Sequence, residues 1–145
     1  MAELSWAREA GEARRAALDR GAPRDHATLV GVMFDGHVNP LWRRLSVAFQ
    51  ETVEAYNAGG QFSDVSFIAT TEHLVAERRH DPRFVIELRL DRAARQLVLI
   101  TKDAGGEAVT DRLEFAFVEG DLMLWHTGQP ENGYQLAKRV LKSRL

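Results

Sequence analysis

The segment from Phe84 to Thr127 constrains the fold most strongly, because it reads as consecutive antiparallel strands joined by short turns. Apolar residues occupy every second position from Phe84 to Leu90, and the alternation returns at Leu113, Phe115 and Phe117. A period of two is typical of a half-buried strand. The pattern predicts strands at 83–90, 96–102, 109–118 and 121–127.

A long helix is predicted before these strands. Its apolar residues are spaced by three or four and form one stripe: Trp42, Leu45, Phe49, Val53 and Tyr56. The pair Asp35-Gly36 breaks the preceding apolar pattern, and Asn39 followed by Pro40 is a typical helix start. The sequence therefore predicts a helix from Pro40 to about Asn57, with Phe49 almost fully buried against Phe115 and Phe117.

Two further helices are predicted at the ends of the chain. Asn132 can cap a C-terminal helix that runs to Leu145. Residues 4–20 are rich in alanine and arginine, and they predict a first helix with Ser5 as its cap and a stop at Gly21 and Pro23. We predict an N-terminal helical extension over residues 1–22 and a single domain over 23–145.

Two segments leave their secondary structure open. Residues 28–34 are a short apolar run that fits either a strand or a helix, and residues 70–79 fit either a short helix or a strand. Residues 65–69 predict a strand. The chain as a whole predicts an α+β fold, in which a twisted and mainly antiparallel meander of four to six strands packs against the long helix and the C-terminal helix.

The last hairpin can be placed in register. If Glu119-Gly120 is a two-residue loop, then Phe115 and Phe117 lie on one face of the sheet, while Met123 and Trp125 lie on the other. A loop of three residues would exchange the faces of the last strand. We predict the first register.

The second face of the sheet is predicted to carry an apolar strip. Val98 and Ile100 lie on the face opposite to Leu97 and Leu99, which is also the predicted face of Met123 and Trp125. A monomer rarely leaves such a strip in water. These four residues, Val98, Ile100, Met123 and Trp125, are therefore predicted to form an interface, most simply within a symmetric dimer.

Composition excludes several classes of protein and sites. The net charge of −2 offers no electrostatic footprint for nucleic acid, and the absence of cysteine excludes disulfides and thiolate metal sites. No apolar run reaches membrane-spanning length, and the N-terminal residues lack the apolar run of a signal peptide, so a cytoplasmic location is expected. Among the 19 basic residues only Lys102, Lys138 and Lys142 are lysine, which favours a bacterial genome rich in G and C.

Few residues indicate chemistry. The five histidines show no metal-ligand spacing, and no cofactor motif is present, so neither a metal nor a cofactor is predicted. The weak catalytic candidates are Asp35 and His37, before the predicted helix start, and His126, which the register places on the apolar face. A loop residue and a paired histidine at the edge of the core are the simpler interpretations.

Two functions follow as expectations. The first is a non-catalytic interaction or accessory module that self-associates. The alternative is a protein or enzyme that binds a small apolar ligand in a cavity between curved sheet and helix, with His37 or His126 at its mouth. The order of the elements is similar to that of a helix-grip fold, which is what the alternative requires.

Overall fold

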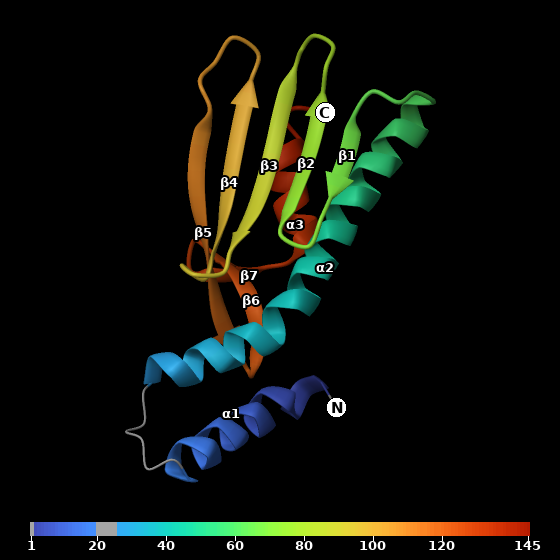
Figure 1. The fold of residues 1–145 in the computed structure, drawn as a ribbon. Coiled ribbons are helices and arrows are strands. Elements are labelled where there is room, and N and C mark those ends of the chain that lie inside the picture. Colours follow the sequence, from blue (N-terminus) through green and yellow to red (C-terminus); the bar gives the residue numbers. More distant parts are fainter. Residues whose placement is uncertain (1, 20–25) are drawn as a thin grey trace.

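The computed structural model describes residues 2–19 and 26–145, and the side chains of 4–16 and 32–145. The predicted helix stop at Gly21 and Pro23 and the predicted boundary between residues 22 and 23 lie outside the described residues. The fold is α+β, as predicted (Figure 1). Its elements are α1 (Ala2–Asp19), α2 (His26–Gly60), β1 (Ser66–Ala69), β2 (His73–Arg78), β3 (Phe84–Asp91), β4 (Gln96–Asp103), β5 (Val109–Val118), β6 (Asp121–His126), β7 (Gln129–Glu131) and α3 (Gly133–Leu141).

The described strands form one antiparallel sheet in which every strand pairs with its neighbours in the sequence, in the order β1 to β7. The prediction of four to six strands was therefore too low. The ambiguous segment 70–79 contains β2, and the Gln129-Pro130 pair lies in β7, which is not among the predicted strands. Proline lacks a backbone N–H, but it is tolerated in β7 because this strand forms the edge of the sheet.

Helix α2 runs without interruption through the predicted break at Asp35-Gly36 and the predicted start at Asn39, so both predictions were wrong. The undecided run 28–34 is part of the same helix. A proline inside a helix costs about 3 kcal/mol and commonly causes a kink. Helix α2 changes direction along its length (Figure 1), and Pro40 is the proline inside it.

The buried apolar stripe of α2 explains why the helix continues through Asp35-Gly36 and Asn39-Pro40. Its members are at most 5% exposed: Phe34, Val38, Trp42, Leu45, Phe49 and Val53. Each such side chain contributes roughly 1.5–3 kcal/mol on burial, and together they outweigh the cost of one proline. Glycine at position 36 leaves room for α1, because a Cβ atom there would lie 2.1 Å from the Glu9 carboxylate.

The predicted register of the last hairpin is confirmed. Phe115 pairs with Leu124, and Val118 pairs with Asp121 across the Glu119-Gly120 turn. Both turn residues have positive φ angles, 53° and 85°, as a two-residue hairpin turn requires.

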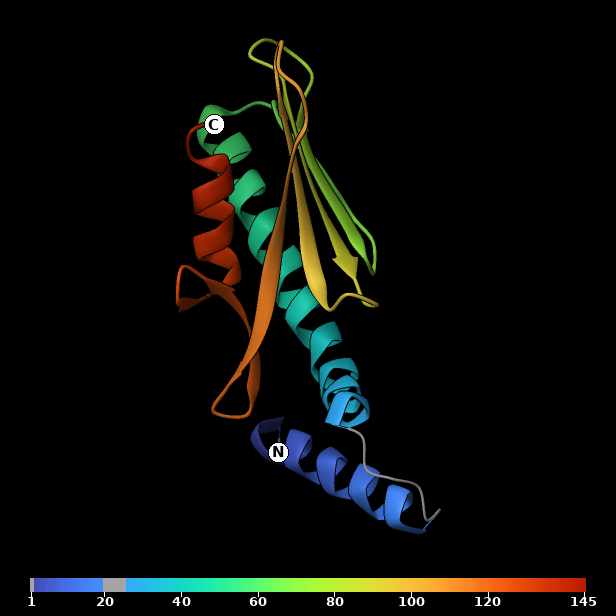
Figure 2. The same cartoon turned by 90° about the vertical axis from the view of Figure 1, so that its left-hand side faces the viewer.

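The core lies between one face of the sheet and the two helices α2 and α3 (Figure 2). Leu97 and Leu99 of β4 face this core and are buried. Phe49 is fully buried, but Phe115 and Phe117 are only half-buried, contrary to the prediction. They lie where β5 and β6 extend past the other strands, and Phe115 packs edge-on against Phe34.

The predicted cap of the C-terminal helix is confirmed, although the helix ends at Leu141 and not at Leu145. The Asn132 side-chain oxygen accepts a hydrogen bond from the Gln135 backbone N–H at 2.8 Å, and the Gln135 side chain accepts one from the Asn132 N–H at 2.8 Å. This reciprocal pair is a capping box.

Replacing the cap should weaken α3 measurably. We expect Asn132→Ala to lower the free energy of unfolding by about 1 kcal/mol, because the Gln135 backbone N–H at the helix start loses its side-chain partner. Urea denaturation checks this result. Asn132→Ser keeps a capping oxygen and serves as the control, and equal losses in both variants would contradict the role of the cap.

Candidate functional site

The structure does not bring Asp35 and His37 together as an acid–base pair. Both belong to α2, and residues two apart on a helix point to different sides. Asp35 is exposed, whereas His37 is half-buried and packs edge-on against Phe117, with 5.9 Å between ring centroids. Its Nε2 atom is buried and has no hydrogen-bond partner among the described residues.

His126 occupies a different part of the structure. It ends β6, is half-buried and pairs with Gln129 of β7. His37 contacts Phe117 of the β5–β6 hairpin, and Phe117 pairs with Leu122. Leu122 lies four residues before His126 in the same strand. Four residues of strand span about 13 Å, so the two histidines do not share one site.

The four predicted interface residues all lie on the outer face of the sheet, but they form two groups. Val98 and Ile100 belong to β4, and Met123 and Trp125 belong to β6. Between them, β5 places Arg112 beside Val98 and Glu114 beside Trp125. The outer face is therefore apolar on both sides of a charged middle strand, and none of the described helices covers it (Figure 2).

The outer face also carries a three-residue charge cluster. Glu87 of β3 accepts hydrogen bonds from Arg89 at 2.8 and 3.1 Å and contacts the imidazole of His73. Partial burial opposes ionisation of Glu87, but the bonds from Arg89 and His73 outweigh it and hold the pKa of the carboxyl below its ordinary value. The carboxylate therefore stays charged on a face that is partly shielded from water.

A buried arginine at the C-terminal end of β2 was not predicted. Arg78 is only 6% exposed. Its guanidinium donates to Asp64 at 2.7 Å, to the Tyr56 hydroxyl at 2.6 Å, and to the backbone carbonyls of Arg144 at 2.8 Å and Pro82 at 3.4 Å. One side chain thus joins the end of α2, the strand β2 and the C-terminus.

Asp64, the acidic partner of Arg78, is also bound by Tyr56. The Tyr56 hydroxyl donates to Asp64 at 2.8 Å. This bond is the main cause that holds the pKa of Asp64 below its ordinary value, and the same bond raises the pKa of Tyr56. The sequence did carry a signal, since Arg78 follows Leu74 and Ala76 at an inward-facing position of β2.

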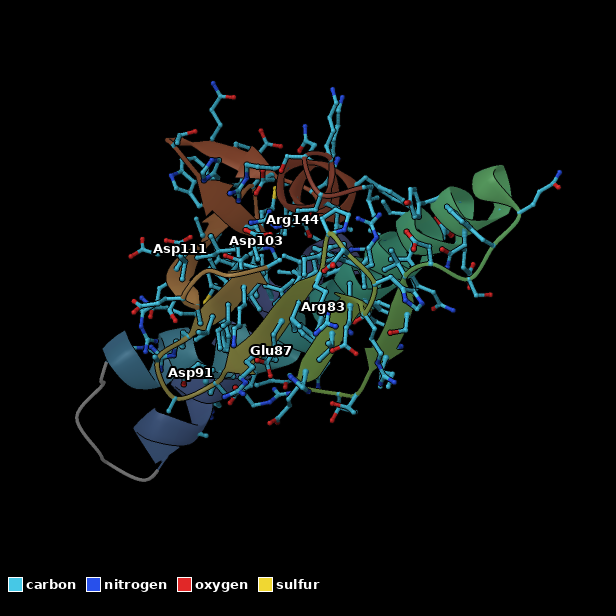
Figure 3. All side chains as sticks on the ribbon, turned by 90° about the horizontal axis from the view of Figure 1, so that it is seen from above. Arg83, Glu87, Asp91, Asp103, Asp111 and Arg144 are labelled. Atoms are coloured by element: carbon cyan, nitrogen blue, oxygen red, sulfur yellow. The ribbon has the colours of Figure 1, made fainter. Side chains whose placement is uncertain are left out.

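A surface ion pair ties the C-terminal segment to the same end of the sheet. Arg144 donates to both oxygens of Asp103, at 2.8 and 3.0 Å, and Figure 3 shows the two side chains next to each other. Asp103 ends β4. The pair holds the base of the β4–β5 loop against the end of the chain.

A groove of about 610 Å³ opens at this end, with Arg79, Arg83 and Lys102 among its lining residues. Arg79 is 3.1 Å from Glu77, and Arg83 is 3.8 Å from Asp81. The charge of these arginines is therefore partly compensated on the exposed surface, which leaves Lys102 as the cation of the groove without a partner among the described residues.

No protein-family model matches the chain, and no curated protein or solved structure is significantly similar to it. Among the described residues there is no group of three or more His, Asp or Glu side chains that could hold a metal ion. None of the described helices is long and apolar enough to cross a membrane. The function must therefore be argued from the surfaces of this chain.

Proposed function

We propose that this protein is a non-catalytic interaction module that self-associates through the outer face of its sheet. The observation that carries the proposal is the combination of apolar side chains on this face, Val98 and Ile100 on one side and Trp125 on the other, with no described helix covering them. Apolar surface of this kind marks interaction sites. A cytoplasmic location and a bacterial source remain expectations from the sequence.

The charges of the outer face support a second copy as the partner. Arg89 and Arg112 lie level with each other across the strands, and Asp91 and Glu114 lie level with each other two residues further along. A two-fold axis that crosses the strands between these levels places each arginine opposite a carboxylate of the partner. Trp125 lies level with Glu114, and it would be enclosed near that axis.

The packing of α2 supports this class of function over a ligand cavity between sheet and helix. Trp42, Leu45 and Phe49 fill the layer beneath the sheet and are at most 5% exposed. His37 and His126, the candidates for the mouth of a cavity, lie apart. Because this layer is filled by side chains, the outer face of the sheet is the surface we propose for recognition.

Charge reversal tests the proposed pairing. Arg112→Glu or Glu114→Arg alone should weaken self-association at least about tenfold, because each places like charges opposite one another twice in a symmetric dimer. The double variant should restore the dimer, since the pattern is again complementary. Light scattering after gel filtration measures the mass, and circular dichroism checks that each variant is folded.

Trp125 provides an independent variant. Trp125→Glu should shift the protein toward monomer, because it introduces a charge into the apolar part of the contact. Val47→Glu is the matched control, since Val47 is 43% exposed on α2, away from the sheet face. A double charge reversal that fails to restore the dimer, or equal effects of Trp125→Glu and Val47→Glu, would contradict the proposal.

A further inference from the structure

A second pocket, of about 370 Å³, lies on a different part of the molecule. It is formed between α2, the β1–β2 turn and the β3–β4 turn, and Figure 1 shows the β1–β2 turn beside α2. The residues that concern its chemistry are Trp42, Arg43, Ser46, Thr70, Thr71 and Arg92. Ser46 is three residues from Arg43 and four from Trp42, so α2 presents it next to both side chains.

The walls of this pocket are fixed by hydrogen bonds. The Trp42 indole N–H donates to the Thr70 carbonyl at 2.9 Å, which holds the β1–β2 turn against α2. Arg92 donates to the Asn39 side chain at 2.6 Å and to Glu72 at 2.9 Å. The pocket is therefore largely formed before any ligand enters, which lowers the entropic cost of binding.

Two polar groups in the lining lack partners. The Ser46 hydroxyl oxygen is buried and has no hydrogen-bond partner among the described residues. Arg43 is exposed, and it makes no hydrogen bond or ion pair within the described part of the chain. Buried polar groups are usually paired, so the Ser46 hydroxyl calls for a partner, and the exposed guanidinium of Arg43 is available beside it for an anion from solution.

The charge of the lining indicates what that partner is. The pocket is lined by two arginines, Arg43 and Arg92, and by no carboxylate. Glu72 lies nearby, but Arg92 already binds it. Guanidinium and hydroxyl groups are the usual donors to carboxylate and phosphate oxygens, and Trp42 and Ala69 supply apolar surface beside them.

We propose that this pocket binds a small organic anion, with its carboxylate or phosphate on Arg43 and the hydroxyls of Ser46 and Thr71, and its apolar part against Trp42 and Ala69. The volume lies at the lower end for ligand pockets, which limits the ligand to a small molecule. The site is separate from the outer sheet face, so it stands or falls independently of self-association.

The indole N–H of Trp42 provides a direct readout, because its NMR signal reports on the wall of the pocket. Butyrate and methyl phosphate are the probes for the two head groups, and butylamine is the cationic control. We expect saturable shifts of this signal with one of the anions, with a dissociation constant of about 1 mM or lower, and none with butylamine. No saturable shift with either anion, or an equal response to butylamine, would overturn the proposal.

Variants separate the ligand contact from structure. Arg43→Gln should weaken binding of the anion at least about tenfold, whereas Arg44→Gln, the neighbouring exposed arginine outside the pocket, should change it less than about twofold. Ser46→Ala should weaken binding while leaving the melting temperature unchanged or higher, because it removes a buried hydroxyl without a partner. Equal affinities in wild type, Arg43→Gln and Ser46→Ala would overturn the proposal, and all these variants should keep the wild-type mass.

Discussion

Replacing Arg78 by methionine should lower the free energy of unfolding by about 3–5 kcal/mol, the range for breaking a buried charge pair. Methionine fills part of the volume but donates no hydrogen bond. Asp64, the Tyr56 hydroxyl and the Arg144 carbonyl would each lose their contact with the guanidinium. Urea denaturation followed by circular dichroism measures the loss.

The next residue in the chain supplies the control. Arg79 pairs with Glu77 on the surface, and its side chain is 82% exposed. Exposed ion pairs contribute little, so Arg79→Met should change the free energy of unfolding by less than about 0.5 kcal/mol. Equal effects at the two positions would mean that the Arg78 cluster does not join the end of α2 to the sheet.

The second large effect is expected in the core. Phe49 is fully buried against the sheet, so Phe49→Ala should cost about 3–5 kcal/mol. Phe115 is only half-buried at the extended end of β5, and Phe115→Ala should cost about 1–2 kcal/mol, because less area is lost from an apolar environment. Both losses are measured by denaturation under the same conditions.

The difference between the two phenylalanines tests the extent of the core. A loss for Phe115→Ala as large as that for Phe49→Ala would show that the core extends fully beneath the β5–β6 hairpin. Phe117→Leu keeps most of the apolar volume beside His37 and should cost less than about 1.5 kcal/mol.

The strands were the most predictable part of the fold, because their signals are local. Alternation from Phe84 to Leu90 depends only on which face of each strand is buried. The Glu119-Gly120 turn fixes the register of the last hairpin through its length alone. The Asn132 capping box is also contained within four consecutive residues, so it could be predicted in the same way.

The errors arose where a distant contact outweighs a local signal. Asp35-Gly36 and Asn39-Pro40 each indicate a boundary, but the stripe from Phe34 to Val53 is buried along the whole of α2. Proline therefore changes the direction of the helix without ending it. The strand count was low because β2 and the edge strand β7 are short and carry weak patterns.

The candidate sites were predictable only in part. Trp125 and Val98 were correctly placed on the outer face, but the sequence did not show that Arg112 and Glu114 stand between them. The Arg78 cluster and the pocket beside Ser46 depend on residues from separate elements. Such groupings require the tertiary fold, because no single segment contains them.

Sedimentation equilibrium of the unmodified protein tests the central claim most directly, because the proposed function depends on self-association through the outer sheet face. The chain has a mass of 16.3 kDa. At micromolar concentrations we predict a mass that rises with concentration toward twice this value, as mass action requires for a reversible dimer. A mass of 16.3 kDa at every concentration would contradict the account.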